Sequence, residues 1–159
     1  MGIEIERKFL VDDDSWRNEA SDSGTDYRQG YLAVVPNCSV RIRLADNQAW
    51  LTIKSGEGGL TRQEFEYPLP LDDAEGLLAL CEPTVISKTR YLASCGDHRW
   101  EIDEFHDANA GLVVAEIELS SEDEAFETPG WLGKEVSDDV RYYNAYLSSR
   151  PYRLWKHEV

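Results

Sequence analysis

Alternation of charged and apolar residues with a period of two dominates this sequence and restricts the folds open to it. Such a period is typical of β-strands, because successive side chains of a strand point to opposite faces of the sheet. Eight strands are expected, over residues 3–11, 27–35, 40–44, 50–54, 62–67, 86–92, 100–105 and 113–119. Turn-forming residues separate several of them, and residues 56–59 are interpreted as a hairpin loop.

Helices are expected to be few and short. Three are predicted, over residues 72–80, 121–126 and 137–148. Asp72 is the expected cap of the first, Ser121 and Glu124 form a capping box for the second, and Ser137 or Asp138 caps the third. The predicted fold is therefore β-dominated α+β, with about eight antiparallel strands and a few covering helices. Closing the sheet into a barrel would remove its exposed edges.

Length and composition indicate a single domain over residues 1–159, with 42% hydrophobic and 30% charged residues. The formal net charge of −15 favours solubility and argues against nucleic acid as a partner. No apolar run approaches the roughly 20 residues that span a bilayer, so no membrane association is expected. The three cysteines, Cys38, Cys81 and Cys95, have no metal-binding spacing and favour a reduced, cytoplasmic location.

The charged faces of the expected strands are built from pairs of like charge. Glu4 and Glu6 share a face with Lys8, and Arg41 and Arg43 share a face of a later strand. A solvent-exposed face would also alternate, and for any single strand that is the common explanation. Like charges two residues apart repel each other, however, and favour a bound counter-ion. Acidic pairs suit divalent cations and basic pairs suit phosphate oxygens, so a barrel enclosing both could hold a metal–polyphosphate complex.

The order of these motifs resembles that of a known family. Glu4-Ile5-Glu6-Arg7-Lys8 forms an ExExK signature near the N-terminus. The likeness continues through Arg28-Gln29-Gly30-Tyr31-Leu32, Arg41-Ile42-Arg43, Thr52-Ile53-Lys54, Arg62-Gln63-Glu64-Phe65-Glu66, Lys88-Thr89-Arg90-Tyr91, Glu101-Ile102-Asp103 and Glu116-Ile117-Glu118. It covers nearly the whole chain, which resembles the CYTH superfamily of triphosphate tunnel metalloenzymes, in particular its small bacterial members that hydrolyse inorganic tripolyphosphate.

The resemblance implies a closed eight-stranded antiparallel barrel with a charged interior and a C-terminal helix at one mouth. It implies that substrate is bound by Lys8, Arg41, Arg43, Lys54, Lys88 and Arg90. It also implies that Mg²⁺ or Mn²⁺ is bound by Glu4, Glu6, Glu116 and Glu118, with Glu64, Glu66 and Asp103 as further candidates. Of these residues, Glu4, Glu6, Lys8 and Lys88 are the expected catalytic set.

The expected activity is metal-dependent hydrolysis of a linear triphosphate, foremost inorganic tripolyphosphate to pyrophosphate and phosphate, by in-line attack of a metal-positioned water. Thiamine triphosphatase and class IV adenylyl cyclase are alternatives, since a pocket for an organic group is not excluded by sequence. A non-catalytic polyphosphate-binding module is an alternative of another class, although such a module should lose its metal-binding carboxylates. The expected partner is a small polyphosphate, and the chain is expected to be a monomer or homodimer.

Overall fold

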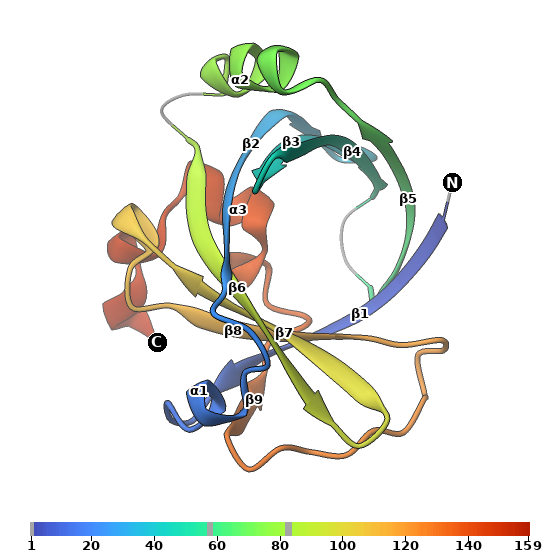
Figure 1. Cartoon of the computed structure of the whole chain (residues 1–159), viewed down its shortest axis with the longest axis vertical. Coiled ribbons are helices and arrows are strands. Elements are labelled where there is room, and N and C mark those ends of the chain that lie inside the picture. Colours follow the sequence, from blue (N-terminus) through green and yellow to red (C-terminus); the bar gives the residue numbers. More distant parts are fainter. Residues whose placement is uncertain (1, 57–58, 82–83) are drawn as a thin grey trace.

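The computed structural model describes residues 2–56, 59–81 and 84–159, in which nine strands form one antiparallel sheet that closes on itself (Figure 1). The strands are β1 (Gly2–Val11), β2 (Thr25–Val35), β3 (Cys38–Ala45), β4 (Gln48–Ser55), β5 (Thr61–Pro68), β6 (Ile86–Cys95), β7 (His98–Phe105), β8 (Val113–Glu118) and β9 (Leu132–Glu135). Their order is β5-β4-β3-β2-β6-β7-β8-β1-β9, and β5 also pairs with β1. The first eight strands therefore make a closed barrel, as predicted, and β9 is an addition alongside β1.

Strand β1 closes the barrel by pairing with different strands along its length. Its first half pairs with β5, where Glu4 lies opposite Arg62. Its second half pairs with β8, where Lys8 lies opposite Glu116. Because directly opposite residues of an antiparallel pair point to the same face, the charges of these three strands meet inside the barrel.

The hydrophobic core lies outside the barrel, between the outer face of the sheet and the segments that cover it. One group of buried residues surrounds Trp100 and Trp131. A second joins Ile42 of β3 to Leu78 of helix α2 (Leu71–Ala79). A third, around Trp155, packs under the C-terminal segments. The apolar faces of the strands thus point outward under cover, which leaves the charged faces to line the interior.

The covering helices are short. Besides α2 they are α1 (Trp16–Glu19), α3 (Asn144–Ser149) and the 3₁₀ turns η1 (Asp107–Asn109), η2 (Val140–Tyr142), η3 (Tyr152–Leu154) and η4 (Lys156–Glu158). Helix α2 matches the predicted helix over residues 72–80, but Pro70 precedes it and Asp72 lies in its first turn. Gly30 of β2 lies beneath this helix, and a Cβ there would come within 2.5 Å of the Cβ of Cys81.

Two of the predicted helices are not present as predicted. In the segment predicted as a helix over residues 121–126, the Ser120 N–H donates to Glu124, as in a helix cap, but only a turn forms and no helix follows. The cause is tertiary packing, because Phe126 contacts Phe9 and Trp100 edge-on, with ring centroids 6.1 and 5.7 Å away. The helix predicted over residues 137–148 is split into η2 and α3 by Tyr143, whose backbone is extended with φ −75° and ψ 139°.

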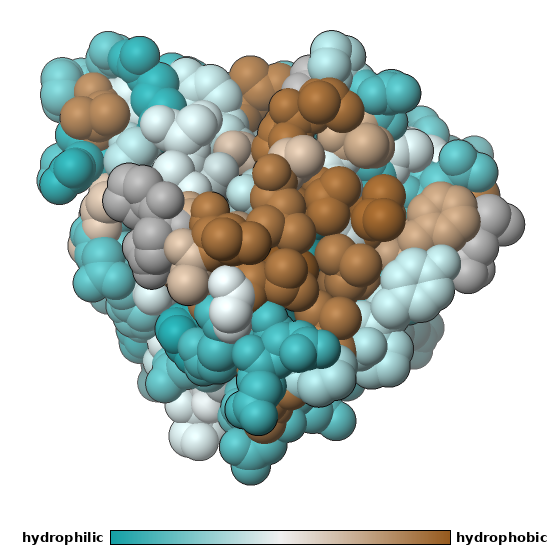
Figure 2. All heavy atoms as spheres, turned by 90° about the horizontal axis from the view of Figure 1, so that it is seen from above, coloured by the Kyte–Doolittle hydropathy of each residue, from teal (hydrophilic) through white to brown (hydrophobic). Residues whose placement is uncertain are grey.

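The eight predicted strands are all present, whereas α1 and β9 have no counterpart among the predictions. Of the predicted hairpin loop at residues 56–59, residues 57 and 58 lie outside the described part of the chain. Within the described residues, no helix is long and apolar enough to cross a membrane. Figure 2 shows the face that carries α2, where apolar side chains gather between hydrophilic margins; Leu71 and Leu80, at the two ends of this helix, are exposed.

Candidate active site

The barrel encloses a cavity of about 500 Å³ whose lining combines the charged faces of the strands with uncharged residues such as Tyr31, Val140 and Tyr146. The predicted site residues brought together there are Glu4, Glu6, Lys8, Arg41, Arg43, Lys54, Glu64, Glu66, Lys88, Arg90, Glu116 and Glu118. Asp103 is placed differently, since it lies behind the lining with 1% of its surface exposed. Arg62 and Glu101 also line the cavity and were not among the predicted site residues.

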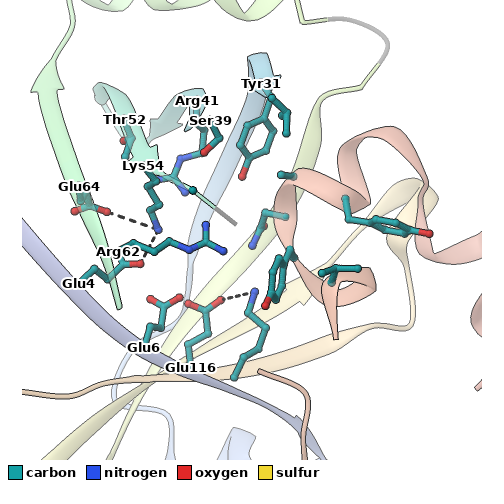
Figure 3. Close-up of a pocket in the computed structure, with 18 of the residues that line it drawn as sticks. Glu4, Glu6, Tyr31, Ser39, Arg41, Thr52, Lys54, Arg62, Glu64 and Glu116 are labelled. Atoms are coloured by element: carbon teal, nitrogen blue, oxygen red, sulfur yellow. Dashed lines mark hydrogen bonds and ion pairs between the residues drawn. The ribbon is translucent and has the colours of Figure 1, made fainter. Parts of the chain in front are cut away.

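Two strands on opposite sides of the barrel carry charges of opposite sign. Strand β3 contributes Arg41 and Arg43 to the cavity and no carboxylate, whereas β8 contributes Glu116 and Glu118 and no cation. In the ring of eight strands, four steps separate β3 from β8 in either direction, so the two strands face each other across the barrel. Figure 3 accordingly shows Arg41 on the far side of the cavity from Glu6 and Glu116.

Three carboxylates on the acidic wall form a cluster, consisting of Glu6, Glu101 and Glu116. One oxygen of each lies within 4.8 Å of the others. Burial and the repulsion of Glu116 and Glu4 raise the pKa of Glu6 well above its ordinary value. Burial also acts to raise the pKa of Glu116, but the attraction of Lys8, Arg90 and Lys88 together outweighs it and lowers that pKa to about 2. Three carboxylates this close together fit a hard divalent cation such as Mg²⁺ or Mn²⁺.

A second group of charges is centred on Lys54 of β4. Its Nζ lies 2.9 Å from Glu4 Oε1 and 3.6 Å from Glu64 Oε2 (Figure 3). Burial works against the charged form of Lys54, yet the attraction of Glu6 and Glu4 leaves its pKa raised. Burial also raises the pKa of Glu4, with the attraction of Lys54 opposing it. This lysine therefore offsets part of the negative charge near the carboxylate cluster.

Asp103 of β7 holds two cations from behind the cavity wall. Its Oδ2 accepts hydrogen bonds from Lys88 Nζ at 2.7 Å and Arg90 Nη2 at 2.9 Å, and its Oδ1 accepts from Arg90 Nε at 2.7 Å. Burial alone would raise the pKa of Asp103, but the two cations keep it far below its ordinary value. For Lys88, burial and the repulsion of Arg90 lower the pKa to about 7 despite the attraction of Asp103. Asp103 thus orients Lys88 and Arg90, and both of its oxygens accept hydrogen bonds from them.

Three arginines of the cavity have no carboxylate partner among the described residues, namely Arg41, Arg43 and Arg62. Arg41 is 7% exposed, and its Nε is buried without a hydrogen-bond partner in the described part of the chain. Burial and the repulsion of Arg41 and Arg90 lower the pKa of Arg43 to about 10. Buried charges are normally paired, so this group is complementary to an anion.

The segment over residues 137–149, called the closing segment below, covers one side of the cavity. Its Tyr143 ring lies 5.4 Å from both Lys8 Nζ and Arg62 Cζ, and Lys8 Nζ donates to the carbonyl of Tyr142 at 3.2 Å. The hydroxyl of Tyr143 donates to the Ser137 carbonyl at 2.6 Å, which fixes the extended residue between η2 and α3. The C-terminal helix expected at the cavity mouth is therefore present as α3.

The comparisons with known proteins cover nearly the whole chain. A family model described as CYTH domain matches residues 2–145. The chain is 43% identical to an inorganic triphosphatase of Acetivibrio thermocellus over 157 residues, which are 98% of this chain and 99% of that relative. It is 38% identical to an inorganic triphosphatase of Nitrosomonas europaea over 150 residues, 91% of this chain and 96% of the relative. The crystal structure of an inorganic triphosphatase matches with TM-score 0.65 and 34% identity, over 93% of this chain and 95% of that one.

Proposed function

Because the chain belongs to the CYTH domain family, we propose that it hydrolyses linear triphosphates in this cavity, and foremost inorganic tripolyphosphate to pyrophosphate and phosphate. The observation that carries the proposal is the group of unpaired arginines, Arg41, Arg43 and Arg62, in the same cavity as a cluster of carboxylates. Two relatives that match nearly the whole chain are inorganic triphosphatases, which favours an inorganic over an organic substrate.

The carboxylate cluster is the proposed site for Mg²⁺ or Mn²⁺, with Glu4 and Glu118 beside it and Glu64 and Glu66 as further candidates. When bound there, the cation would offset phosphate charge and position the attacking water for in-line displacement. Its presence would also relieve the repulsion that raises the pKa of Glu6. Glu101 is added to the candidate metal ligands because one of its oxygens lies in the cluster. Asp103 is instead proposed to orient Lys88 and Arg90.

Phosphate oxygens would be bound by the cations that line the cavity. Arg41, Arg43 and Arg62 are free to pair with them, and arginine suits this task because its planar guanidinium donates several hydrogen bonds in a fixed geometry. The remaining cations, Lys8, Lys54, Lys88 and Arg90, are each oriented by a carboxylate. Fixed donors of this kind stabilise the charge that develops on a transferred phosphoryl group.

The test is a substrate panel of tripolyphosphate, ATP, thiamine triphosphate and pyrophosphate, each with Mg²⁺ or Mn²⁺. We expect tripolyphosphate to be cleaved with the highest kcat/KM. Arg41→Met should raise KM about 10- to 100-fold through loss of charge-assisted contacts, and Glu116→Gln should mainly lower kcat. Arg17→Met, which removes an outer-surface cation paired with Glu104, is the control and should leave both constants unchanged.

Other results would assign a different function. Formation of cyclic AMP and pyrophosphate from ATP as the preferred reaction would indicate a cyclase. Tight binding of tripolyphosphate without turnover under either metal would indicate a polyphosphate-binding module. A cytoplasmic location and a monomeric or homodimeric state stay predictions from the sequence.

A further inference from the structure

Strand β2 differs from the other seven strands of the barrel, because its inward face carries no charge. Tyr27, Gln29 and Tyr31 alternate on that face, and Val34 and Val35 further along the strand also line the cavity. Gln29 lies opposite Arg43 in the register of β2 and β3, and its side chain is fully buried, with 0% of its surface exposed. A buried amide without partners would be costly, so the contacts of Gln29 indicate what holds it there.

Both ends of the Gln29 amide are engaged by the site. Its Oε1 accepts a hydrogen bond from Arg43 Nε at 3.0 Å, and its Nε2 donates to Asn144 Oδ1 at 2.9 Å. The same oxygen of Asn144 accepts from Lys88 Nζ at 3.2 Å. An uninterrupted series of hydrogen bonds thus runs from Arg43 through two neutral amides to Lys88, and on to Asp103.

The direction of this series is imposed by the two cations. Arginine and lysine can only donate, so Arg43 requires the oxygen of Gln29 and Lys88 requires the oxygen of Asn144. The nitrogen of Gln29 is then the group that faces Asn144 Oδ1. Reversing the amide of Gln29 would place two donors together at Arg43 and two acceptors together at Asn144. Only a neutral amide at position 29 satisfies both neighbours at once.

The amide oxygens of Gln29 and Asn144 accept hydrogen bonds from Arg43 and Lys88 without adding a negative charge that would compete with phosphate. Arg90 contrasts with Arg43, because its Nε and both terminal nitrogens donate to Asp103 and Glu101. Within the described residues, Arg43 donates only through Nε, and its terminal nitrogens have no hydrogen-bond partner. Tyr27 adds an aromatic face at 5.0 Å from Arg43 Cζ without adding a negative charge.

We propose that Gln29 and Asn144 are positioning residues, which hold Arg43 and Lys88 in place for the phosphates of the substrate without adding a negative charge beside them; this rests on the proposed function. Asn144 is the first residue of α3, and the next two residues of this helix, Ala145 and Tyr146, line the cavity. The two amides therefore also fix the closing segment to the cations that it covers.

The test introduces charge without changing shape. Gln29→Glu should form an ion pair with Arg43 that competes with phosphate, and Asn144→Asp should do the same with Lys88. Each should raise KM for tripolyphosphate about tenfold or more, with a change in kcat of less than about threefold. Gln29→Met removes the acceptor and keeps a similar length, and it should raise KM by a smaller factor.

A double variant distinguishes positioning of Arg43 by Gln29 from a purely structural role of Gln29. In an Arg43→Met background, Gln29→Glu should have little further effect on KM, because the cation that it acts on is gone, whereas a loss of general packing would add. Asn109→Leu is the matched control: Asn109 is a buried amide outside the cavity that accepts from the Tyr152 N–H, so its loss should lower the melting temperature and leave KM unchanged.

The inference and the proposed function fail in different ways. If Arg43→Met raises KM while Gln29→Glu and Asn144→Asp both leave it within about twofold, the positioning role is refuted and the proposed function stands. Additive effects of Gln29→Glu and Arg43→Met would refute it as well. If the unaltered protein does not cleave tripolyphosphate, or Arg43→Met has no effect on its KM, the proposed function fails and the inference with it.

Discussion

Replacing Asp103 by asparagine should cost far more stability than the same change in an ion pair at the surface. Asp103 is 1% exposed and accepts three hydrogen bonds of 2.7 to 2.9 Å from Lys88 and Arg90. The asparagine has nearly the same shape but no charge. It would leave the buried Lys88 without its carboxylate partner and Arg90 with Glu101 alone.

The expected loss follows from the burial of all three groups. Removing one partner of a buried ion pair costs about 3–5 kcal/mol. A domain of this size loses roughly 2–4 °C in melting temperature per kcal/mol, so the melting temperature should fall by about 6–20 °C. The control is Asp139→Asn, since Asp139 pairs with Arg141 at 2.6 Å and both side chains are about one third exposed. Water screens a pair so accessible, so its loss should lower the melting temperature much less.

The assay is thermal and urea unfolding of both variants and the unaltered protein, with tripolyphosphate added in the absence of metal. A polyanion in the cavity should compensate the cations exposed by Asp103→Asn, and should therefore raise the melting temperature of this variant more than that of the unaltered protein. A loss no larger than that of Asp139→Asn, or equal shifts with tripolyphosphate, would refute the role assigned to Asp103.

Three further predictions concern metal and protons. Stripping the metal and adding chelator should abolish hydrolysis, because the carboxylate cluster then lacks its counter-charge; full activity would contradict the proposed metal site. Without metal, stability should fall as the pH rises through the raised pKa of Glu6, since burial and Glu116 disfavour the charged form; Glu6→Gln should flatten this dependence in urea unfolding between pH 4 and 8. Lys88, whose pKa burial lowers to about 7, should take up a proton when tripolyphosphate binds near pH 7.5. Calorimetry in two buffers of different ionisation enthalpy measures this uptake, and equal heats would exclude it.

The sequence predicted the barrel and its charged lining because alternation fixes which residues share a face of a strand. Alternation does not say which face points inward. The like-charged pairs, such as Glu116 with Glu118, resolved this question, since repulsion of that kind is tolerated where counter-ions are bound. The same pattern could have identified Arg62 and Glu101, which share faces with Glu64 and Asp103 and line the cavity.

What the sequence did not predict depends on contacts between distant segments. Strand β9 pairs for only a few residues beside β1, and the chain before it forms no helix because Phe126 packs on Trp100. The closing segment has helical spacing, but the contacts of Tyr143 with Ser137 and Lys8 interrupt it. Gln29 and Asn144 carry no local signal at all, because their importance arises only when β2, β3 and α3 meet.

The balance of charge in the cavity indicates what kind of ligand it fits. Among the described residues, seven cationic and seven carboxylate side chains line it, so their formal charges cancel, and the chain's net charge of −15 lies outside the cavity. The acidic exterior repels a free polyanion, and the neutral interior offers no net attraction to one. Attraction must come from the separation of charge, with arginines on β3 and carboxylates on β8, the opposite strand. A polyphosphate accompanied by a divalent cation is complementary to both walls at once, whereas either component alone meets one favourable wall and one repulsive wall.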